Sequence, residues 1–118
     1  MSDFRMGPGE LRFAQLIWEN EPISSGALAK LALEHISWKK TTAFTVLKRL
    51  CDRGLFQNEG GTVTSVMSRE EYDARHSALY VEENFGGSLP AFLAAFGSRK
   101  KLSQDEIRQL EALIERMR

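Results

Sequence analysis

Hydroxyl and cationic side chains gather between Trp38 and Gly54, at a spacing that suits contact with duplex DNA. This segment holds five basic residues against one acid. At about 100° per residue, Thr41, Thr45 and Lys48 share one face of a helix, where they can bond base edges or phosphates in a major groove. The apolar residues recur at steps of three, one and three, which predicts the opposite, buried face; they are Ala43, Val46, Leu47 and Leu50.

The same segment alone also fits an ordinary amphipathic helix whose basic face is merely solvated. Gly54 supplies the residue that most easily adopts the left-handed conformation at the end of a helix. The surrounding elements must therefore decide between the two interpretations.

Length and composition indicate a small globular protein. The 118 residues suit one domain, or one compact domain with an oligomerising appendage. The single cysteine, Cys51, rules out an intramolecular disulfide and a cysteine cluster for a structural metal. No apolar run approaches the ~18 residues that a membrane span requires. We therefore expect a cytoplasmic protein with no membrane partner, no metal and no cofactor.

The charge is balanced overall but unevenly placed. The formal net charge is zero, yet residues 38–53 carry five cations and one anion, and residues 68–85 carry two cations and five anions. Phosphate contact depends on the local field, because charges farther away than about 8–10 Å are screened. A basic face on a neutral chain predicts weak nonspecific DNA binding, which dimerisation would strengthen.

Helix and turn signals place the basic segment third in a series. The first helix is predicted from about Pro8 to Asn20, and the second begins at a cap supplied by Ser24 or Ser25. The basic segment follows Trp38 as the third helix.

A hairpin is predicted directly after these helices. Leu55–Glu59 and Thr62–Met67 have strand character, and Gly60-Gly61 between them favours a tight turn. Three helices followed by a hairpin are typical of a winged helix-turn-helix, although a hairpin that only completes the core fits the strands equally well. The predicted fold class is mainly α with a small β-hairpin (α+β).

Three more helical segments with apolar stripes follow the hairpin. They begin near Ser68, Leu89 and Ser103. Because no further core is predicted to bury them, they indicate either a homodimer, which we favour, or packing back onto the winged helix. We expect a flexible N-terminus over residues 1–8, a DNA-binding domain over 9–67 and a dimerisation region over 68–118. The predicted dimerisation residues are Leu79, Phe85, Leu89, Phe92, Leu93, Phe96, Ile107, Leu110, Leu113 and Ile114.

The order of these features resembles the penicillinase-repressor family, which includes β-lactamase, methicillin-resistance and copper-transport repressors. The similarity extends from about Gly9 to Arg118. Its most specific parts are ELRFAQLIWENEPIS (10–24), WKKTTAFTVLKRLCDRGL (38–55), SREEY (68–72) and FGGSLPAFLAAF (85–96). The resemblance implies a homodimeric winged-helix repressor on a palindromic operator, released by an upstream signal through a regulatory protease or sensor.

The family pattern W-x-x-x-T-x-x-T-x-L-x-R-L-x-x-x-G also implies roles for particular residues. Thr42 and Thr45 match its threonines and Arg49 its arginine. Thr42 and Arg49 lie closer to the buried side of the helix, so each either contacts DNA or stabilises the fold. For Arg49, the partner is either DNA, the hairpin or the first helix. The predicted DNA-binding residues are Lys39, Lys40, Thr41, Thr42, Phe44, Thr45, Lys48 and Arg49; the predicted wing tip is Gly60, Gly61 and Thr62.

Four departures from the family pattern distinguish this chain from the relatives that the resemblance names. Phe44 stands where the family often has a polar or basic residue, which indicates a different operator read through thymine methyl groups. The wing tip carries no Lys or Arg. Ala95-Phe96 stands where well-known relatives are cleaved at an Asn-Phe bond, and the cysteine-rich motif of the copper-responsive branch is missing, which excludes copper sensing by that route.

The leading hypothesis is therefore a sequence-specific DNA-binding repressor, and the alternative is a winged-helix protein-interaction adaptor with little or no DNA binding. An enzyme is not expected. His35 and His76 stand apart from carboxylates at catalytic or ligand spacing, and Gly60-Gly61 lacks the surroundings of a phosphate loop.

Overall fold

The protein is described by a computed structural model over residues 3–118, and within that range it forms six helices and three strands. Two compact units can be distinguished, Met1–His76 and Ser77–Arg118, with the longest helix contributing to both. The elements in chain order are α1 (Pro8–Asn20), β1 (Ile23–Ser24), α2 (Ser25–Ile36), α3 (Lys40–Asp52), β2 (Phe56–Glu59), β3 (Thr62–Ser65), α4 (Arg69–Phe85), α5 (Leu89–Arg99) and α6 (Gln104–Arg116). This composition confirms the predicted fold class.

Local capping explains where the first helices begin. Pro8 occupies the first turn of α1, and the carboxylate of Glu10 accepts a hydrogen bond from the backbone N–H of Gly7. Of the two candidate caps for α2, Ser24 is the one used, since its Oγ accepts from the N–H of Ala27 at 3.1 Å.

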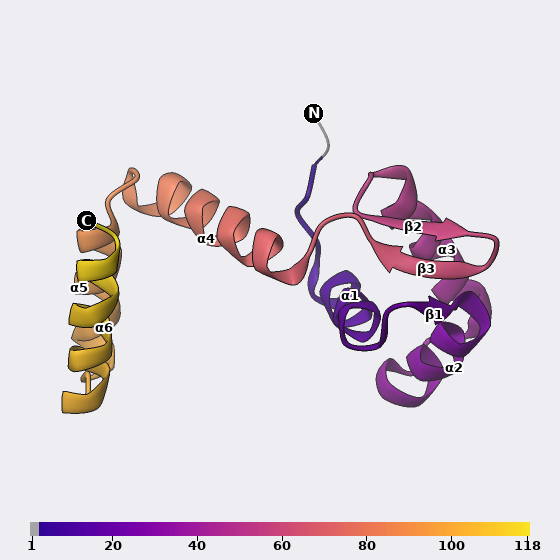
Figure 1. Cartoon of the computed structure of the whole chain (residues 1–118), viewed down its shortest axis with the longest axis horizontal. Helices are drawn as coiled ribbons and strands as arrows, with labels where there is room; N and C mark the ends of the chain where they lie inside the picture. The colour runs from indigo at the N-terminus through magenta and orange to yellow at the C-terminus, as the bar shows by residue number, and fades with distance from the viewer. Residues whose placement is uncertain (1–2) are drawn as a thin grey trace. The chain divides into compact units, whose positions relative to one another are not determined.

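Figure 1 shows three helices, α1 to α3, and the small sheet of the first unit. The buried side chains of these elements, joined by Tyr72 of α4, form one hydrophobic core. Each helix contributes one apolar face to it, as the periodicity predicted for α3. The fully buried large side chains are Phe13, Ile17, Leu28, Leu50, Leu55, Phe56 and Val63.

The sheet contains one strand more than the sequence predicted. Its order is β1-β3-β2, antiparallel throughout, with Ile23 opposite Val63 and Glu59 opposite Thr62. Gly60 and Gly61 both have positive φ, as a two-residue hairpin turn requires. The third strand, β1, has two residues, which is too short to produce a recognisable alternation.

Two polar contacts hold the hairpin against α1. The indole Nε1 of Trp18 donates to the carbonyl of Met67 at 3.0 Å, and the carboxylate of Glu21 accepts from both the N–H and the Oγ of Ser65 at 2.9 Å. The end of α1 and the base of β3 are thereby fixed together.

The N-terminal segment was expected to be flexible over residues 1–8, of which residues 1 and 2 lie outside the described part. Residues 3–7 form no helix or strand, and α1 already begins at Pro8. Phe4 and Met6 are nevertheless partly buried against the core. The ring of Phe4 meets the ring of Tyr72 edge-on, with 6.1 Å between the ring centroids. Tyr72 is itself buried, which explains why the first unit includes the opening turns of α4.

The second unit differs from the first in having little buried surface. Within residues 77–118, all of which the structure describes, no hydrophobic side chain is fully buried. A chain of aromatic contacts joins Tyr80, Phe85, Phe92 and Phe96, with ring centroids 5.5–6.3 Å apart.

The short apolar helix in this unit is longer than predicted. The apolar helical spacing, with Leu89, Phe92, Leu93 and Phe96 on one face, ends at Phe96 and predicts a loop from Gly97, whereas α5 continues to Arg99. Ser98 Oγ donates to the carbonyl of Ala95 at 2.8 Å, which accompanies the extra turn. Among the described residues, no helix is long and apolar enough to cross a membrane.

Two leucines of α2 provide a matched test of this core. Leu28 is 1% exposed and Leu33 is 58% exposed. We expect Leu28→Ala to lower the free energy of unfolding by about 2–5 kcal/mol, because it leaves a cavity, and Leu33→Ala to change it by no more than about 0.5 kcal/mol. Urea unfolding followed by circular dichroism measures both, and equal losses for the two variants would contradict the assigned core.

Candidate nucleic-acid interface

Helix α3 is held by one face, and this fixes the direction of its polar side chains. Ala43, Val46, Leu47 and Leu50 are all at most 6% exposed, in the core that α3 shares with α2 and β2. Thr41, Thr42, Thr45 and Lys48 are exposed on the remaining surface. The burial pattern is the one that the periodicity of the sequence predicted.

Three threonines line a shallow hollow on this outer surface. The hollow measures about 200 Å³, and Val46 and Arg49 complete its lining beside Thr41, Thr42 and Thr45. Thr45 Oγ1 donates to the carbonyl of Thr41 at 2.8 Å, so its only proton is used within the helix. Toward an incoming ligand the side chain therefore offers an acceptor oxygen and a methyl group.

The lysines of α3 are exposed and weakly engaged. Lys48 Nζ donates to Asp52 Oδ2 at 3.0 Å one turn away, and Lys40 Nζ lies 5.7 Å from the centroid of the Phe44 ring. Exposed pairs of this kind contribute about 0–1 kcal/mol, so a phosphate group can replace either partner at little cost. Lys39 is the N-cap residue, exposed, and provides no side-chain capping bond.

The arginines have stronger partners inside the protein. Arg49 Nη1 donates to Glu10 Oε2 at 3.3 Å, so of the three alternatives that the sequence left open for Arg49, the structure shows contact with the first helix. Arg53 Nη1 donates to the same oxygen at 3.4 Å. The sequence offered the first helix as one partner of Arg49 but did not identify Glu10, which lies 39 residues before Arg49 and has no periodic relation to it. Arg53 was counted only as a cation of the basic face.

The predicted wing tip is exposed at Gly60 and Thr62 and half-buried at Gly61, and its only charge is one carboxylate. Gly60, Gly61 and Thr62 form the turn and the start of β3, and Glu59 precedes them. The N–H of Ser25 donates to the carbonyl of Gly61 at 2.8 Å, which ties the turn to the start of α2. This tip offers a phosphate backbone no cation.

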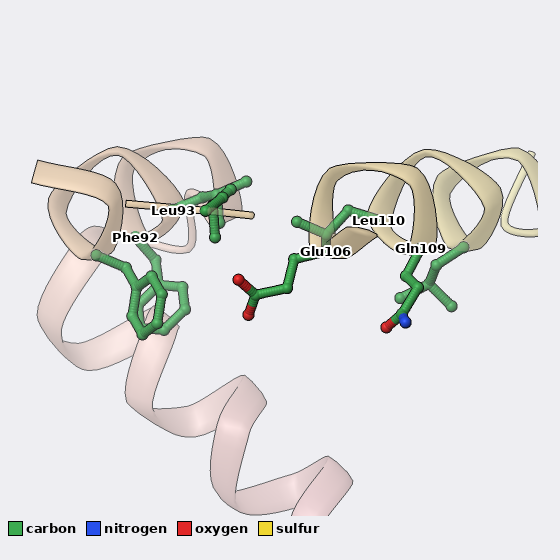
Figure 2. A pocket seen from close by; sticks show the side chains of 8 residues that line it. Phe92, Leu93, Glu106, Gln109 and Leu110 are labelled. Carbon is green, nitrogen blue, oxygen red and sulfur yellow. The ribbon is translucent and has the colours of Figure 1, made fainter. Parts of the chain in front are cut away.

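Five of the ten predicted dimerisation residues line an apolar hollow in the second unit. It measures about 370 Å³ between α5 and α6 and includes Glu106 and Gln109 in its lining. Figure 2 shows Phe92 and Leu93 on one side and Leu110, with the two polar side chains, on the other. Phe92, Leu93, Phe96, Leu110 and Leu113 line the hollow, Leu89 and Ile114 are more than half exposed, and Leu79, Phe85 and Ile107 are partly buried.

The remaining candidate groups do not form a catalytic arrangement among the described residues. His76 stacks on Tyr72 at 5.4 Å, His35 is exposed in the last turn of α2, and no group of three or more His, Cys, Asp or Glu side chains in residues 3–118 is placed to hold a metal. Ala95 and Phe96, the candidate cleavage junction, are exposed within α5.

Comparison with known proteins identifies relatives over almost the whole chain. The family model described as penicillinase repressor matches residues 6–116. A penicillinase repressor from Bacillus licheniformis is 24% identical over 115 residues, which cover 94% of this chain and 90% of the relative. Both matches include the α3 region as well as the second unit.

The cysteine beside the outer surface of α3 gives a test of its local environment. Burial, followed by the nearby charge of Asp52, raises the pKa of the Cys51 thiol. A raised pKa lowers the thiolate fraction at pH 7.5, so we expect iodoacetamide to modify native protein more slowly than urea-unfolded protein, with the difference shrinking as the pH rises through the folded pKa. Mass spectrometry measures both rates, and equal rates at pH 7.5 would disprove the shielding.

Proposed function

This chain belongs to the penicillinase repressor family, a family of transcriptional repressors, and from that premise we propose that it represses transcription as a homodimer on a palindromic operator. Each protomer inserts α3 into a major groove, and the occupied operator excludes the transcription machinery. The observation that carries this proposal is α3 itself, whose core-facing stripe leaves three threonines and two lysines directed outward.

The chemistry of the outer face supports base contact by the threonines and phosphate contact by the lysines. Thr41, Thr42 and Thr45 offer hydroxyl oxygens and methyl groups, which match base-edge donors and thymine methyls. Lys39, Lys40 and Lys48 surround this face with cations that have only weak partners or solvent around them.

The second unit supports the homodimer. Leu89 and Ile114 expose more than half of their surface, and Leu93, Phe96 and Leu113 are 36–44% exposed beside the hollow between α5 and α6. Apolar surface concentrated in this way is typical of an interaction site, and a second copy of the chain is the simplest partner. A two-fold dimer places two α3 helices about one helical turn of DNA apart, or a small multiple of that distance.

Release from the operator by an upstream signal is also part of the proposal. Ala95 and Phe96 are accessible, but α5 holds the bond between them in a helix. A regulatory protease acting at this junction therefore requires α5 to unfold locally first.

The acidic wing tip favours one alternative, an adaptor that binds a protein instead of DNA. Two measurements on the purified full chain discriminate between the readings: fluorescence anisotropy with calf-thymus DNA at low salt, and sedimentation velocity at micromolar concentration. The repressor predicts DNA binding by a dimer. A monomer that leaves the DNA anisotropy unchanged at low salt would exclude it.

Lys48 tests the phosphate contacts. We expect Lys48→Ala to weaken binding to calf-thymus DNA and to reduce the slope of log K against log salt by about 0.9, the value for one released counterion. Lys101→Ala, in the loop before α6, is the control and is expected to keep the wild-type slope. A wild-type slope for Lys48→Ala would remove this residue from the interface.

Thr45 tests base contact. We expect Thr45→Ala to change which duplexes are enriched when the protein selects from random DNA, because the acceptor oxygen is lost from the hollow. Its affinity for calf-thymus DNA should remain close to wild type, since no charge changes. Enrichment of the same sequences by both proteins would show that Thr45 reads no base.

A further inference from the structure

Glu10 joins the N-terminal segment, α1 and α3 through a single carboxylate. Oε1 accepts from the N–H of Gly7 at 3.1 Å, and Oε2 accepts from Nη1 of both Arg49 and Arg53, at 3.3 and 3.4 Å. The side chain is 19% exposed, so water screens these pairs less than it screens the exposed pair of Lys48 and Asp52.

Arg53 donates its side-chain hydrogen bonds to other residues of the protein. Its Nε and Nη2 donate to the carbonyl of Asp3 at 3.1 and 2.8 Å, Nη2 also donates to the carbonyl of Arg5, and the side chain is 23% exposed. The Nε, Nη1 and Nη2 nitrogens of Arg53 therefore all have acceptors, and the side chain holds the N-terminal segment against the end of α3.

Arg49 is placed differently. Its side chain is 55% exposed and lines the hollow formed by Thr41, Thr42 and Thr45, while one nitrogen bonds Glu10. A guanidinium has five N–H donors in a rigid, planar fork. A single bond to Glu10 therefore restricts the orientation of the guanidinium plane of Arg49 and leaves its other N–H groups for an external acceptor.

We propose that Glu10 is a positioning residue of the DNA interface: it holds the guanidinium of Arg49 beside the threonine hollow and cancels part of its charge. The inference rests on the proposed function. Held in one orientation, Arg49 can meet a base edge or phosphate only in the register that the threonines also require. Because the carboxylate of Glu10 offsets part of its charge, Arg49 contributes little to the binding of arbitrary sequences.

Glu10→Gln separates this role from a purely structural one. A glutamine can keep the oxygen that accepts from Gly7, so the start of α1 is retained, whereas the oxygen shared by Arg49 and Arg53 becomes an NH2 group that cannot accept from a guanidinium. Arg53 still donates to the carbonyls of Asp3 and Arg5, so Arg49 is the arginine that loses its partner. We expect a steeper salt dependence on calf-thymus DNA, by about 0.9 in slope, because Arg49 becomes available to phosphates. The ratio of affinities for a duplex selected from random DNA by the wild type and for calf-thymus DNA should fall about tenfold. Glu19→Gln, an exposed residue of the same helix, is the matched control and should leave both quantities unchanged.

The double variant identifies the residue through which Glu10 acts. In an Arg49→Gln background, adding Glu10→Gln should produce no further change in slope or ratio. Arg49→Gln alone leaves the contact between Glu10 and Arg53 in place. It should itself lower the ratio of affinities for the selected duplex and calf-thymus DNA about tenfold. This variant provides a second test if Glu10→Gln unfolds at the assay temperature.

The outcomes separate the two proposals. If the wild type binds no duplex, the proposed function fails. If the wild type binds its selected duplex and Glu10→Gln matches Glu19→Gln in slope and ratio, or if Arg49→Gln keeps the wild-type ratio, the function stands and the positioning role of Glu10 is wrong.

Discussion

The packing of α3 by a single face is the constraint on which the rest of the site depends. Ala43, Val46, Leu47 and Leu50 are buried in the core of the first unit, so the helix cannot rotate without exposing them. Apolar burial contributes about 25 cal/mol per Å², and four such side chains outweigh the weak exposed pair of Lys48 and Asp52. The burial of this face therefore determines that the threonines point outward, and the exposed charge pairs contribute less to the orientation of the helix.

Several cations of α3 are paired with carboxylates, some of which a DNA phosphate can replace more easily than others. The chain has no net charge, and the cations of α3 have partners of graded strength: Asp52 for Lys48, and the partly buried Glu10 for Arg49 and Arg53. A duplex can displace the exposed pair, whereas Arg53 stays with the protein. We interpret this gradation as a way to limit attraction to arbitrary DNA. In the proposed dimer, the exposed apolar surface of the second unit would supply the avidity that the weak charge pairs do not.

Local patterns in the sequence predicted the elements, and contacts between distant residues were the part that it could not reveal. The steps between Ala43 and Leu50 identified the buried face of α3, and Gly60-Gly61 identified the hairpin turn, because both signals lie within a few residues. The pairing of β1 with β3 and the contact of Glu10 with Arg49 join residues about 40 positions apart, and neither leaves a periodic trace. The contact between Phe4 and Tyr72 joins residues still farther apart in the chain and has no local signal either. The assignment of residues to DNA contact and dimerisation remains a prediction.

Hydroxyl-radical footprinting of the full chain on a duplex selected from random DNA tests the central claim most directly. If a dimer inserts one α3 per protomer, the account predicts two protected patches related by two-fold symmetry, with centres about 10 base pairs apart or a small multiple of that. A single unsymmetrical patch, or cleavage unchanged by saturating protein, would contradict it.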